Sequence, residues 1–313
     1  MKPEEVARAW NVGEVRSLRP LNGGSINGAF RVEAAAGDFH LRVYRSPDWA
    51  RVEREHAAID VAVRVGVPTP APLPTRVGGT VAELGTTLAA LFPALPGAPT
   101  PRADLTPRHA AALGTFLADL HECLPSHVPF EVPDLRPASV GRTLERLERI
   151  EAVLLALPAP DEVDGWALTR TRQRLAHLRD SPLPDHAPAF PARFLHGDYH
   201  EGNVFFINGQ ITALIDWEQT RRAPRAWEVV RCLSLSLKLD PALCAAFLRG
   251  YRDRLPLPEE ELADGAALYA LVQERNVWTY ESVYVEGNPG PRVFIGPPPY
   301  APFQTRWAGS GLR

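Results

Sequence analysis

The sequence predicts an α+β protein with two lobes, and three observations support this prediction. Side chains in the first hundred residues alternate between polar and apolar over 30–33 and 39–44, as in half-buried strands. Beyond Pro107 the chain reads mainly as helix, interrupted by one strong hairpin signal at Asn208-Gly209. Its 313 residues are too many for a single compact core. We therefore expect an N-terminal lobe at 1–97, with an antiparallel sheet and a helix, and a mostly helical C-terminal lobe at 98–313.

The N-terminal lobe carries the signals of a small sheet and one helix. The segment 36–38, Ala-Gly-Asp, lies between the two alternating stretches and is typical of a hairpin turn. Apolar residues spaced among charges predict a helix over 48–65, for which Asp48 is a suitable N-cap. A Gly78-Gly79 pair within 77–91 predicts a turn between two further strands.

The C-terminal lobe begins after the proline-rich stretch 93–107 and consists of helices around a hairpin. The apolar segments 204–207 and 211–215 flank Asn208-Gly209 and predict the two hairpin strands. The end of the chain, 289–313, is rich in Pro and Gly and is expected to be irregular. Helices are expected at roughly 107–123, 140–157, 166–180, 227–239, 241–254 and 259–284.

Composition excludes several classes of protein. A net charge of −3 gives no general attraction to nucleic acid or to anionic membranes. The three cysteines lack CxxC spacing, so we expect neither disulfides nor a zinc site, and a cytoplasmic location fits. The uncharged run 84–101 contains four prolines that would break a membrane-spanning helix, and the first residues lack the apolar core of a signal peptide. The oligomeric state is not readable from the sequence.

Two short motifs place oxygen-bearing side chains where phosphoryl-transfer chemistry needs them. HGDYHEGN at 196–203 precedes the hairpin, and IDWE at 215–218 follows it. Since a hairpin returns the chain to the edge where it began, we expect Asp198, Asn203 and Asp216 to converge. One carboxylate can orient a substrate hydroxyl, and the amide and second carboxylate can hold magnesium on a nucleoside triphosphate.

A metal hydrolase is the competing interpretation of the same residues. His196, Asp198, His200 and Asp216 could form a His/Asp metal cluster. That interpretation gives no role to Asn203 or to the glycine loop near the N-terminus, so the phosphoryl-transfer interpretation explains more of the chain.

The two motifs resemble those of the aminoglycoside phosphotransferase/choline kinase superfamily, whose members have a protein-kinase-like fold. The resemblance covers nearly the whole chain. It implies that Asp198 is the catalytic-loop aspartate, that Asn203 and Asp216 bind magnesium, and that His196 stabilises the loop. Glu218 is similar to the choline-kinase form of the motif, where it would help to arrange a second metal or its waters; the alternative is a solvated side chain.

The nucleotide side of the site departs from the family pattern in one place. The glycine-rich segment 21–28 is not a Walker A loop, but it resembles the family's nucleotide-positioning loop. The position that usually carries a phosphate-binding lysine is Arg42, with Glu55 on the next helix as its expected partner. Only two of the 34 basic residues are lysines, so arginine is interpreted as a replacement that retains the charge. The remaining candidate nucleotide-binding residues are Gly23, Gly24, Ser25, Asn27, Phe92 and Leu95.

His40 and the acceptor side are less well specified. Period-2 alternation places His40 on the same face as Arg42, where the family usually has a small apolar residue. The resemblance places the phosphate acceptor in the C-terminal lobe, and Glu228, Trp278 and Glu281 are the candidate acceptor-binding residues. Glu228 has an alternative role in bracing the catalytic loop. Aromatic residues at helical spacing are also common in cores, so a structural role is an alternative for the wall that includes Glu274 and Tyr284.

These observations predict an enzyme that uses ATP and Mg²⁺ to phosphorylate a hydroxyl of a small molecule, with no nucleic acid or membrane partner. Homoserine-kinase-like and protein-kinase-like members of the same fold are alternatives. The HGD motif lacks the Arg-Asp pair of regulated protein kinases, which favours a small acceptor. A non-catalytic nucleotide-binding protein is a further alternative, suggested by Arg42 and His40.

Overall fold

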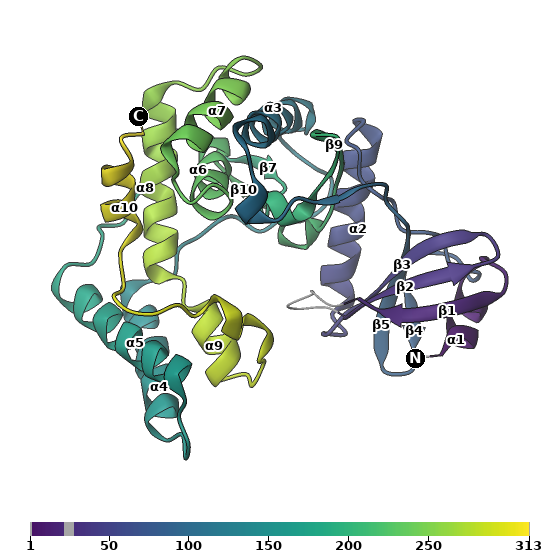
Figure 1. Cartoon of the computed structure of the whole chain (residues 1–313), viewed down its shortest axis with the longest axis horizontal. Helices are drawn as coiled ribbons and strands as arrows, with labels where there is room; N and C mark the ends of the chain where they lie inside the picture. Colours follow the sequence, from purple (N-terminus) through teal and green to yellow (C-terminus); the bar gives the residue numbers. More distant parts are fainter. Residues whose placement is uncertain (1, 22–27, 313) are drawn as a thin grey trace. The chain divides into compact units, whose positions relative to one another are not determined.

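The computed structural model describes residues 2–21 and 28–312, and its contacts divide the chain into two compact units. The first unit comprises 1–134 and 191–258, and the second comprises 135–190 and 259–313. Helices and strands occur in the predicted α+β arrangement, with an antiparallel sheet near the N-terminus and helices dominating afterwards (Figure 1). No helix within the described ranges is long and apolar enough to cross a membrane.

The first unit starts with an antiparallel sheet that has five strands within the described residues. The strand order is β1-β2-β3-β5-β4, and each neighbouring pair is antiparallel. Helix α1 packs on this sheet through Val6, whose cluster includes Trp10, Val32, Leu41 and Leu91, all fully or almost fully buried. The elements are α1 (Pro3–Ala9), β1 (Val15–Pro20), β2 (Gly28–Ala34), β3 (Gly37–Val43), α2 (Trp49–Arg64), β4 (Ala82–Leu84) and β5 (Thr87–Pro93).

The rest of the first unit surrounds the central hairpin. Asn208 and Gly209 both have positive φ angles, 52° and 77°, as the tight turn between β8 and β9 requires. Strand β6 extends this hairpin, and β7 pairs with β10. The elements are β6 (Ala98–Pro99), α3 (Pro107–Cys123), β7 (Arg193–Leu195), β8 (Val204–Ile207), β9 (Gln210–Leu214), β10 (Arg221–Ala223), α6 (Arg225–Leu235) and α7 (Pro241–Arg252).

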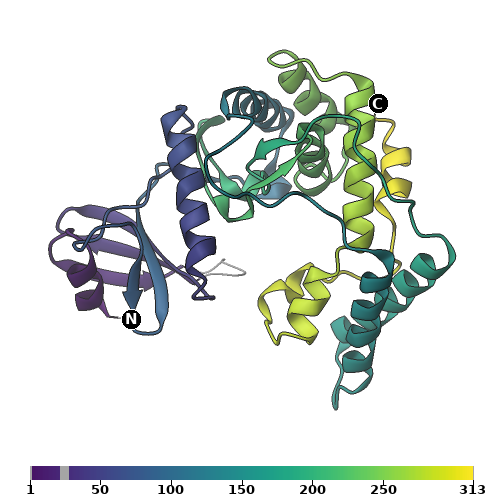
Figure 2. The same ribbon diagram turned by 180° about the vertical axis from the view of Figure 1, so that it is seen from behind.

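The second unit is helical. Helices α4 and α5 lie side by side in both views, and α10 runs along α8 (Figure 2). Leu147, Ile150 and Leu175 belong to one buried cluster that also takes in Tyr280 of α9. The elements are α4 (Val140–Leu155), α5 (Glu162–Asp180), α8 (Glu259–Arg275), α9 (Trp278–Tyr284) and α10 (Phe303–Ser310). The predicted boundary between two lobes at residue 97 stays a prediction. The two units are defined by contacts within the chain and do not test where the lobes divide.

Three sequence-based expectations about local structure were wrong, and one strand was not predicted. The turn between β4 and β5 lies at Gly85-Thr86, because Gly78-Gly79 instead closes a separate loop in which Thr75 N donates to Gly79 O at 2.9 Å. Strand β1 was missed. The helix expected over 259–284 is interrupted: Arg174 Nη2 binds the carbonyl oxygens of Glu274 and Asn276, both at 2.8 Å, and α9 starts anew at Trp278. The end of the chain contains α10 and is not wholly irregular.

Helices α3 and α7 of the first unit pack closely against each other, and glycines permit the contact. A Cβ atom built on Gly114 would lie 2.0 Å from Phe247 O, and one on Gly250 would lie 2.4 Å from Ala111 O. Both distances are far shorter than real Cβ contacts, so the two helix backbones could not approach this closely with alanine at either position.

Gly114→Ala should therefore destabilise the fold, because backbone atoms must move to admit the methyl group. We expect a loss of about 1–3 kcal/mol in the free energy of unfolding, measured by chemical denaturation. Gly165→Ala in α5 is the matched control: nothing lies within 4 Å of its added Cβ, so helix propensity should raise stability by up to about 1 kcal/mol. Equal stability of the Gly114→Ala variant and the wild type would contradict the packing argument.

Candidate active site

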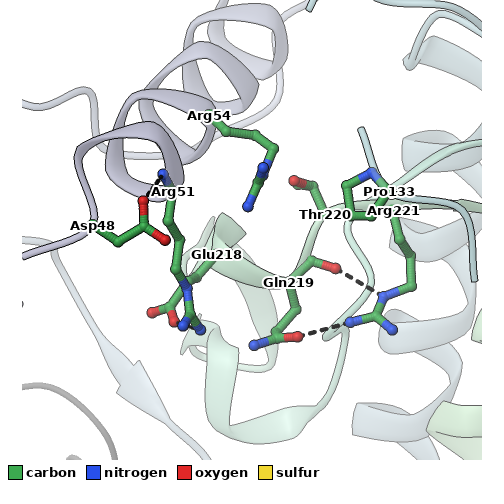
Figure 3. A pocket seen from close by; sticks show the side chains of 8 residues that line it. All are labelled: Asp48, Arg51, Arg54, Pro133, Glu218, Gln219, Thr220 and Arg221. Carbon is green, nitrogen blue, oxygen red and sulfur yellow. Dashed lines mark hydrogen bonds and ion pairs between the residues drawn. The ribbon is translucent and has the colours of Figure 1, made fainter. Parts of the chain in front are cut away.

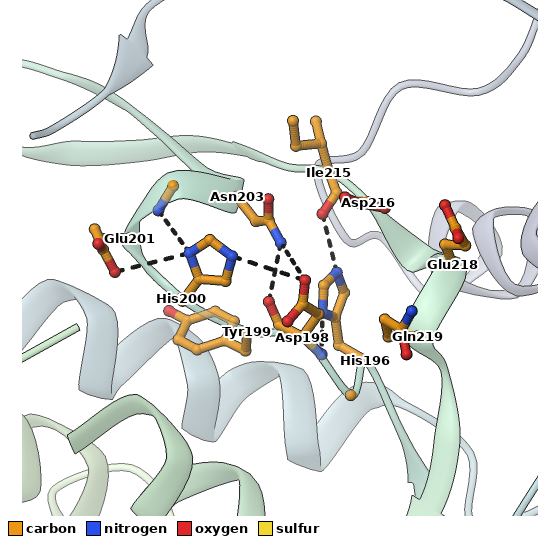
Figure 4. Close-up of polar contacts among 12 residues, drawn as sticks. His196, Asp198, Tyr199, His200, Glu201, Asn203, Ile215, Asp216, Glu218 and Gln219 are labelled. Carbon is orange, nitrogen blue, oxygen red and sulfur yellow. Dashed lines mark hydrogen bonds and ion pairs between the residues drawn. The ribbon is translucent and has the colours of Figure 1, made fainter. Parts of the chain in front are cut away.

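The loop after β7 is shaped by His196 and Gly197 (Figure 4). His196 Nδ1 accepts a hydrogen bond from the backbone N–H of Asp198 at 3.2 Å, and its Nε2 donates to Ile215 O at 3.0 Å. This pattern requires a neutral imidazole, and burial lowers the pKa of His196 accordingly. Gly197 has a φ of 83°, and a Cβ atom there would lie 2.0 Å from Gln219 O. The position therefore admits only glycine.

Glu228 of α6 is hydrogen-bonded to this loop. Its side chain is completely buried; Oε1 accepts from the backbone N–H of Gly197, and Oε2 accepts from His121 Nε2 at 3.1 Å. His121 Nδ1 in turn accepts from the hydroxyl of Tyr251 at 2.8 Å. Burial alone would raise the pKa of Glu228, but the hydrogen bonds from His121 and Gly197 and the charges of His121 and His196 together outweigh burial and lower it. Both oxygens of this carboxylate are hydrogen-bonded within the protein, and none of its surface is exposed.

Asp198 lies in the loop with its carboxylate bonded on both sides. Arg231 Nη2 of α6 forms an ion pair with Oδ1, and Asn203 Nδ2 donates to Oδ2 at 3.2 Å and to Asp198 O at 3.0 Å. His200 Nδ1 accepts from Gly202 N at 3.0 Å, which leaves its Nε2 facing Oδ2 at 3.7 Å. Burial alone would raise the pKa of Asp198, but the charges of Arg231, His200 and His196 and the hydrogen bond from His200 together outweigh it, and the pKa lies well below its ordinary value.

The hairpin brings Asp216 back to this loop. Backbone N–H of Ile215 donates to Asn203 O at 2.9 Å, which joins the end of β9 to the residue before β8. Asp216 then adopts a left-handed conformation, with φ 68° and ψ 67°. Few non-glycine residues adopt it, and a cost of about 1 kcal/mol is typical. The strained turn directs the chain into a short 3-10 helix, Trp217–Gln219, and leaves the Asp216 side chain partly exposed.

Arg42 of β3 connects the N-terminal sheet to the carboxylates of the hairpin. Its Nη1 donates to Glu55 Oε1 at 2.7 Å, and its Nη2 donates to Asp216 Oδ1 at 3.1 Å and Glu218 Oε2 at 2.5 Å. Arg51 of α2 binds the second oxygen of Glu218. Burial would lower the pKa of Arg42, but the surrounding carboxylates outweigh burial and raise it, so the guanidinium keeps its charge.

The other candidate nucleotide-binding residues lie in or beside the same sheet. His40 is half-buried in β3, opposite Phe92 of β5, and burial lowers its pKa. Leu95 is half-buried just after β5, and the neighbouring Ala94 N–H donates to Asp38 O at 3.1 Å. Gly23, Gly24, Ser25 and Asn27 lie outside the described residues.

Two of the three candidate acceptor-binding residues belong to the second unit. Trp278 begins α9 and is 39% exposed, whereas Glu281 is bonded by Arg146 through both carboxylate oxygens. Glu274, which sequence spacing placed on the same helix face, is buried in α8, where its Oε1 accepts from Leu183 N at 3.0 Å and lies 3.0 Å from His177 Nε2. The break between α8 and α9 separates Glu274 from the other two.

A His/Asp metal cluster has no support in this arrangement. Both nitrogens of His196 are used by backbone groups, and no three His, Cys, Asp or Glu side chains within 2–21 and 28–312 gather as a metal-binding group. Asn203 and Asp216, by contrast, supply one amide oxygen and one carboxylate. Oxygen donors of this kind suit magnesium, which takes one or two protein ligands and completes its shell with phosphate and water.

Sequence reasoning missed Arg231 and Arg51. Arg231 lies three residues after Glu228 on α6, so one helix face presents both side chains to the loop. Helical spacing from Glu228 is the signal that could have found it. Arg51 lies four residues before Glu55 on α2, and the same reasoning applies.

Comparison with known proteins identifies the group to which this architecture belongs. Residues 17–263 match the model described as the phosphotransferase enzyme family. The chain belongs to this family. The resemblance drawn from HGDYHEGN and IDWE is thereby confirmed at the level of family.

Relatives of this phosphotransferase family member span most of its length. A homoserine kinase of Chelativorans sp. (strain BNC1) is 27% identical over 288 residues, which cover 87% of this chain and 83% of the relative. An uncharacterized protein of Deinococcus radiodurans is 31% identical over 271 residues, covering 81% of this chain and 73% of the relative.

Solved structures confirm the kinase-like α+β fold. A spectinomycin phosphotransferase in complex with ADP and spectinomycin gives a TM-score of 0.66 at 14% identity, with 98% of this chain and 96% of that chain covered. A microcompartment-associated aminopropanol kinase gives 0.58 at 18% identity, with coverage of 99% and 98%. At these identities the likeness shows the fold alone.

The neutral state of His196 in this family member leads to a pH prediction. Unfolded histidine has a pKa of about 6.5 and the folded-state pKa is lower, so the stability tied to the neutral ring is complete above that pH and is lost as pH falls below it. His196→Gln should unfold about 1–3 kcal/mol more easily at pH 7.5 because loop hydrogen bonds are lost. Between pH 6.5 and 5 the stability of the His196→Gln variant should fall less steeply than that of the wild type. The difference between the two slopes should be up to about 1.4 kcal/mol per pH unit.

Denaturant titrations at several pH values measure this difference. His127→Gln is a suitable control because it removes an exposed imidazole outside the loop. Parallel pH profiles for the wild type and His196→Gln would show that His196 is not held neutral.

Proposed function

We propose that this protein transfers the γ-phosphoryl group of ATP to a hydroxyl of a small molecule, with Mg²⁺ as cofactor. The observation that carries the proposal is the meeting of Asp198, Asn203 and Asp216. The side-chain amide of Asn203 donates a hydrogen bond to the Asp198 carboxylate. The backbone carbonyl of Asn203 accepts a hydrogen bond from the N–H of Ile215, the residue before Asp216. Phosphoryl transfer depends mainly on positioning and charge stabilisation, which three fixed oxygen-bearing side chains can supply.

Asp198 is proposed to orient the acceptor hydroxyl. Its pKa is lowered by the adjacent Arg231, so it is a weak base before the reaction and acts chiefly by accepting the hydroxyl hydrogen bond. Asn203 fixes the position of one carboxylate oxygen at 3.2 Å. The acceptor oxygen is thus aimed by a side chain that is itself held from two directions.

Asn203 and Asp216 are proposed to hold Mg²⁺. The side-chain nitrogen of Asn203 donates to Asp198, so the side-chain oxygen of Asn203 points away from that carboxylate. The side chain of Asp216 is partly exposed. When bound, magnesium neutralises charge on the β- and γ-phosphates. The residues available are therefore of the right type for this ion.

Arg42 is proposed to bind the nucleotide phosphates while Glu55 positions it. The guanidinium keeps its charge and reaches from β3 to Asp216 and Glu218. Arginine binds phosphate through a planar fork, where lysine offers a compact charge. The other proposed nucleotide contacts are Phe92 and Leu95 beside the sheet and the glycine-rich segment with Gly23, Gly24, Ser25 and Asn27.

The acceptor remains the open part of the proposal. Trp278 and Glu281 are retained as proposed acceptor-binding residues, whereas the burial of Glu228 and its bond to Gly197 favour the bracing role. Homoserine is the specific acceptor to test first, because the chain is 27% identical to a homoserine kinase over most of its length. A non-catalytic nucleotide-binding role is the alternative that an activity assay separates.

Magnesium-dependent ATP binding is the first test. ATP with Mg²⁺ should raise the melting temperature, since a ligand at one hundred times its dissociation constant stabilises by about 2.7 kcal/mol. Asn203→Ala and Asp216→Ala should lose this shift. Asp198→Asn should keep it but lower turnover about 10²- to 10⁴-fold in a coupled ADP assay with hydroxylated amines, sugars and amino acids.

Asp119→Asn is the matched control for Asp198→Asn, because Asp119 forms an exposed ion pair with Arg254. Its turnover should equal that of the wild type. Absence of any ATP-dependent shift in the wild type would sink the kinase proposal, and full turnover in Asp198→Asn would remove the role given to that residue.

Replacement of Arg42 tests whether an arginine is required. Arg42→Lys should retain ATP turnover, or increase it, because the lysine charge can still reach phosphate and fewer bonds tie it to Asp216. Arg42→Met should raise the KM for ATP at least about tenfold, which corresponds to roughly 1.4 kcal/mol. An inactive lysine variant beside a folded protein would show that the arginine fork has a function of its own.

A further inference from the structure

A polar pocket lies beside Glu218, between helix α2 and the segment 218–221 (Figure 3). Its volume is about 280 Å³, enough for a small ion or a compact metabolite. Three arginines line it, two from α2 and one from β10, together with two carboxylates. The lining residues that matter here are Asp48, Arg51, Arg54, Glu218, Thr220 and Arg221.

The two carboxylates of the pocket are already engaged. Both oxygens of Glu218 accept from arginine, one from Arg42 and the other from Arg51. Asp48 caps α2 by accepting the backbone N–H of Arg51 at 3.1 Å. The charge of Glu218 is therefore balanced by arginines, whereas Asp48 accepts a backbone hydrogen bond.

Two positive charges of the pocket have no carboxylate partner. Arg54 points into the pocket, and across 2–21 and 28–312 it forms no hydrogen bond or ion pair. Arg221 donates to Gln219 O at 2.9 Å and to Gln219 Oε1 at 2.7 Å, both of them neutral acceptors. Burial lowers the pKa of Arg221, and the nearby positive charge of Arg231 adds to the effect. The charges of Asp198 and Glu228 act on Arg221 in the opposite direction, but among the described residues neither forms an ion pair with it.

Thr220 adds an unused hydroxyl. Its side chain is only 2% exposed, and its oxygen has no hydrogen-bond partner among the described residues. A buried hydroxyl without a partner costs free energy, so such groups are rare and a missing ligand is one explanation. Thr220 lies between Gln219 and Arg221 on the wall of the pocket.

We propose that this pocket binds a small oxyanion, a carboxylate or a phosphate, between Arg54 and Arg221 with Thr220 as an additional donor. Guanidinium groups bind such anions through two parallel hydrogen bonds, and the pocket volume limits the ligand to a small one. None of the three binding residues belongs to the proposed magnesium or nucleotide site, so binding of free phosphate is independent of the proposed function, whereas an acceptor carboxylate rests on it.

The anion can come from either of two sources. It can be the carboxylate of the acceptor, since Arg221 Nε lies 3.0 Å from where a Cβ of Gly197 would be, next to Asp198. It can also be free phosphate. Phosphate in the pocket would be connected to Arg42 through Arg51, because Arg51 lines the pocket and both arginines bind the carboxylate of Glu218. Both sources present the same oxyanion chemistry to Arg54.

Binding of inorganic phosphate tests the pocket directly. Isothermal titration calorimetry at constant ionic strength, with chloride as the balancing anion, would compare the wild type, Arg54→Gln and Arg64→Gln. Arg64 is on the same helix but is paired with Asp60 on the surface, which makes it the matched control. We expect Arg54→Gln to weaken phosphate binding at least tenfold, while Arg64→Gln binds as the wild type does.

A matched pair of organic probes distinguishes the sources. L-homoserine and 3-aminopropan-1-ol differ only in the carboxylate. Arg54-dependent binding of L-homoserine but not of the aminoalcohol assigns the pocket to an acceptor carboxylate, and Arg54-dependent binding of phosphate alone assigns it to the free ion. The proposal is overturned if Arg54→Gln leaves the binding of phosphate and of both probes unchanged, or if neither phosphate nor the probes bind. The ATP-dependent melting shift of the same variants reports separately on the kinase function.

Discussion

The buried carboxylate of Glu228 is the interaction on which the site depends. A charge taken fully out of water is costly unless every lone pair finds a donor, and removal of one partner leaves the other unsatisfied. Here the donors come from the loop, through Gly197 N, and from α3, through His121, which Tyr251 of α7 orients in turn. One carboxylate thus links three helices to the loop that carries Asp198, so helix packing and loop geometry are set together.

The sequence was sufficient where structure is locally encoded. Helix α3 has the predicted bounds because Thr106 caps it and Pro107 occupies its first position, and Asn208-Gly209 fixed the hairpin that joins Asn203 to Asp216. Local sequence signals did not predict features that depend on residues far apart in the sequence. Arg174 binds the carbonyl oxygen of Glu274 in the last turn of α8 and that of Asn276 just after the helix, which no spacing pattern near 275 reveals. Helical spacing from Glu228 indicates the face of α6 on which Arg231 lies, but its contact with Asp198 also depends on how α6 packs against the loop.

The arginine at position 42 makes sense within its surroundings. Glu55, Asp216 and Glu218 all converge on its guanidinium, and the two outer nitrogens divide them, Nη1 with Glu55 and Nη2 with the other two. A lysine would place its three N–H donors on one nitrogen, whereas the planar guanidinium offers two outer nitrogens to this set. Arg51 completes the arrangement by taking the second oxygen of Glu218. The sheet and the hairpin are therefore joined by charge as well as by chain connectivity.

The glycine in the middle of HGD has an evolutionary consequence. Its positive φ and its contact with Gln219 O leave no room for a side chain, and the guanidinium of Arg221 lies beside it. The arginine found at this place in regulated protein kinases could enter only if the segment 217–221 moved at the same time. A side chain at this position would collide with Gln219 O unless that segment moved, so a change from glycine to arginine here requires coupled changes in both segments.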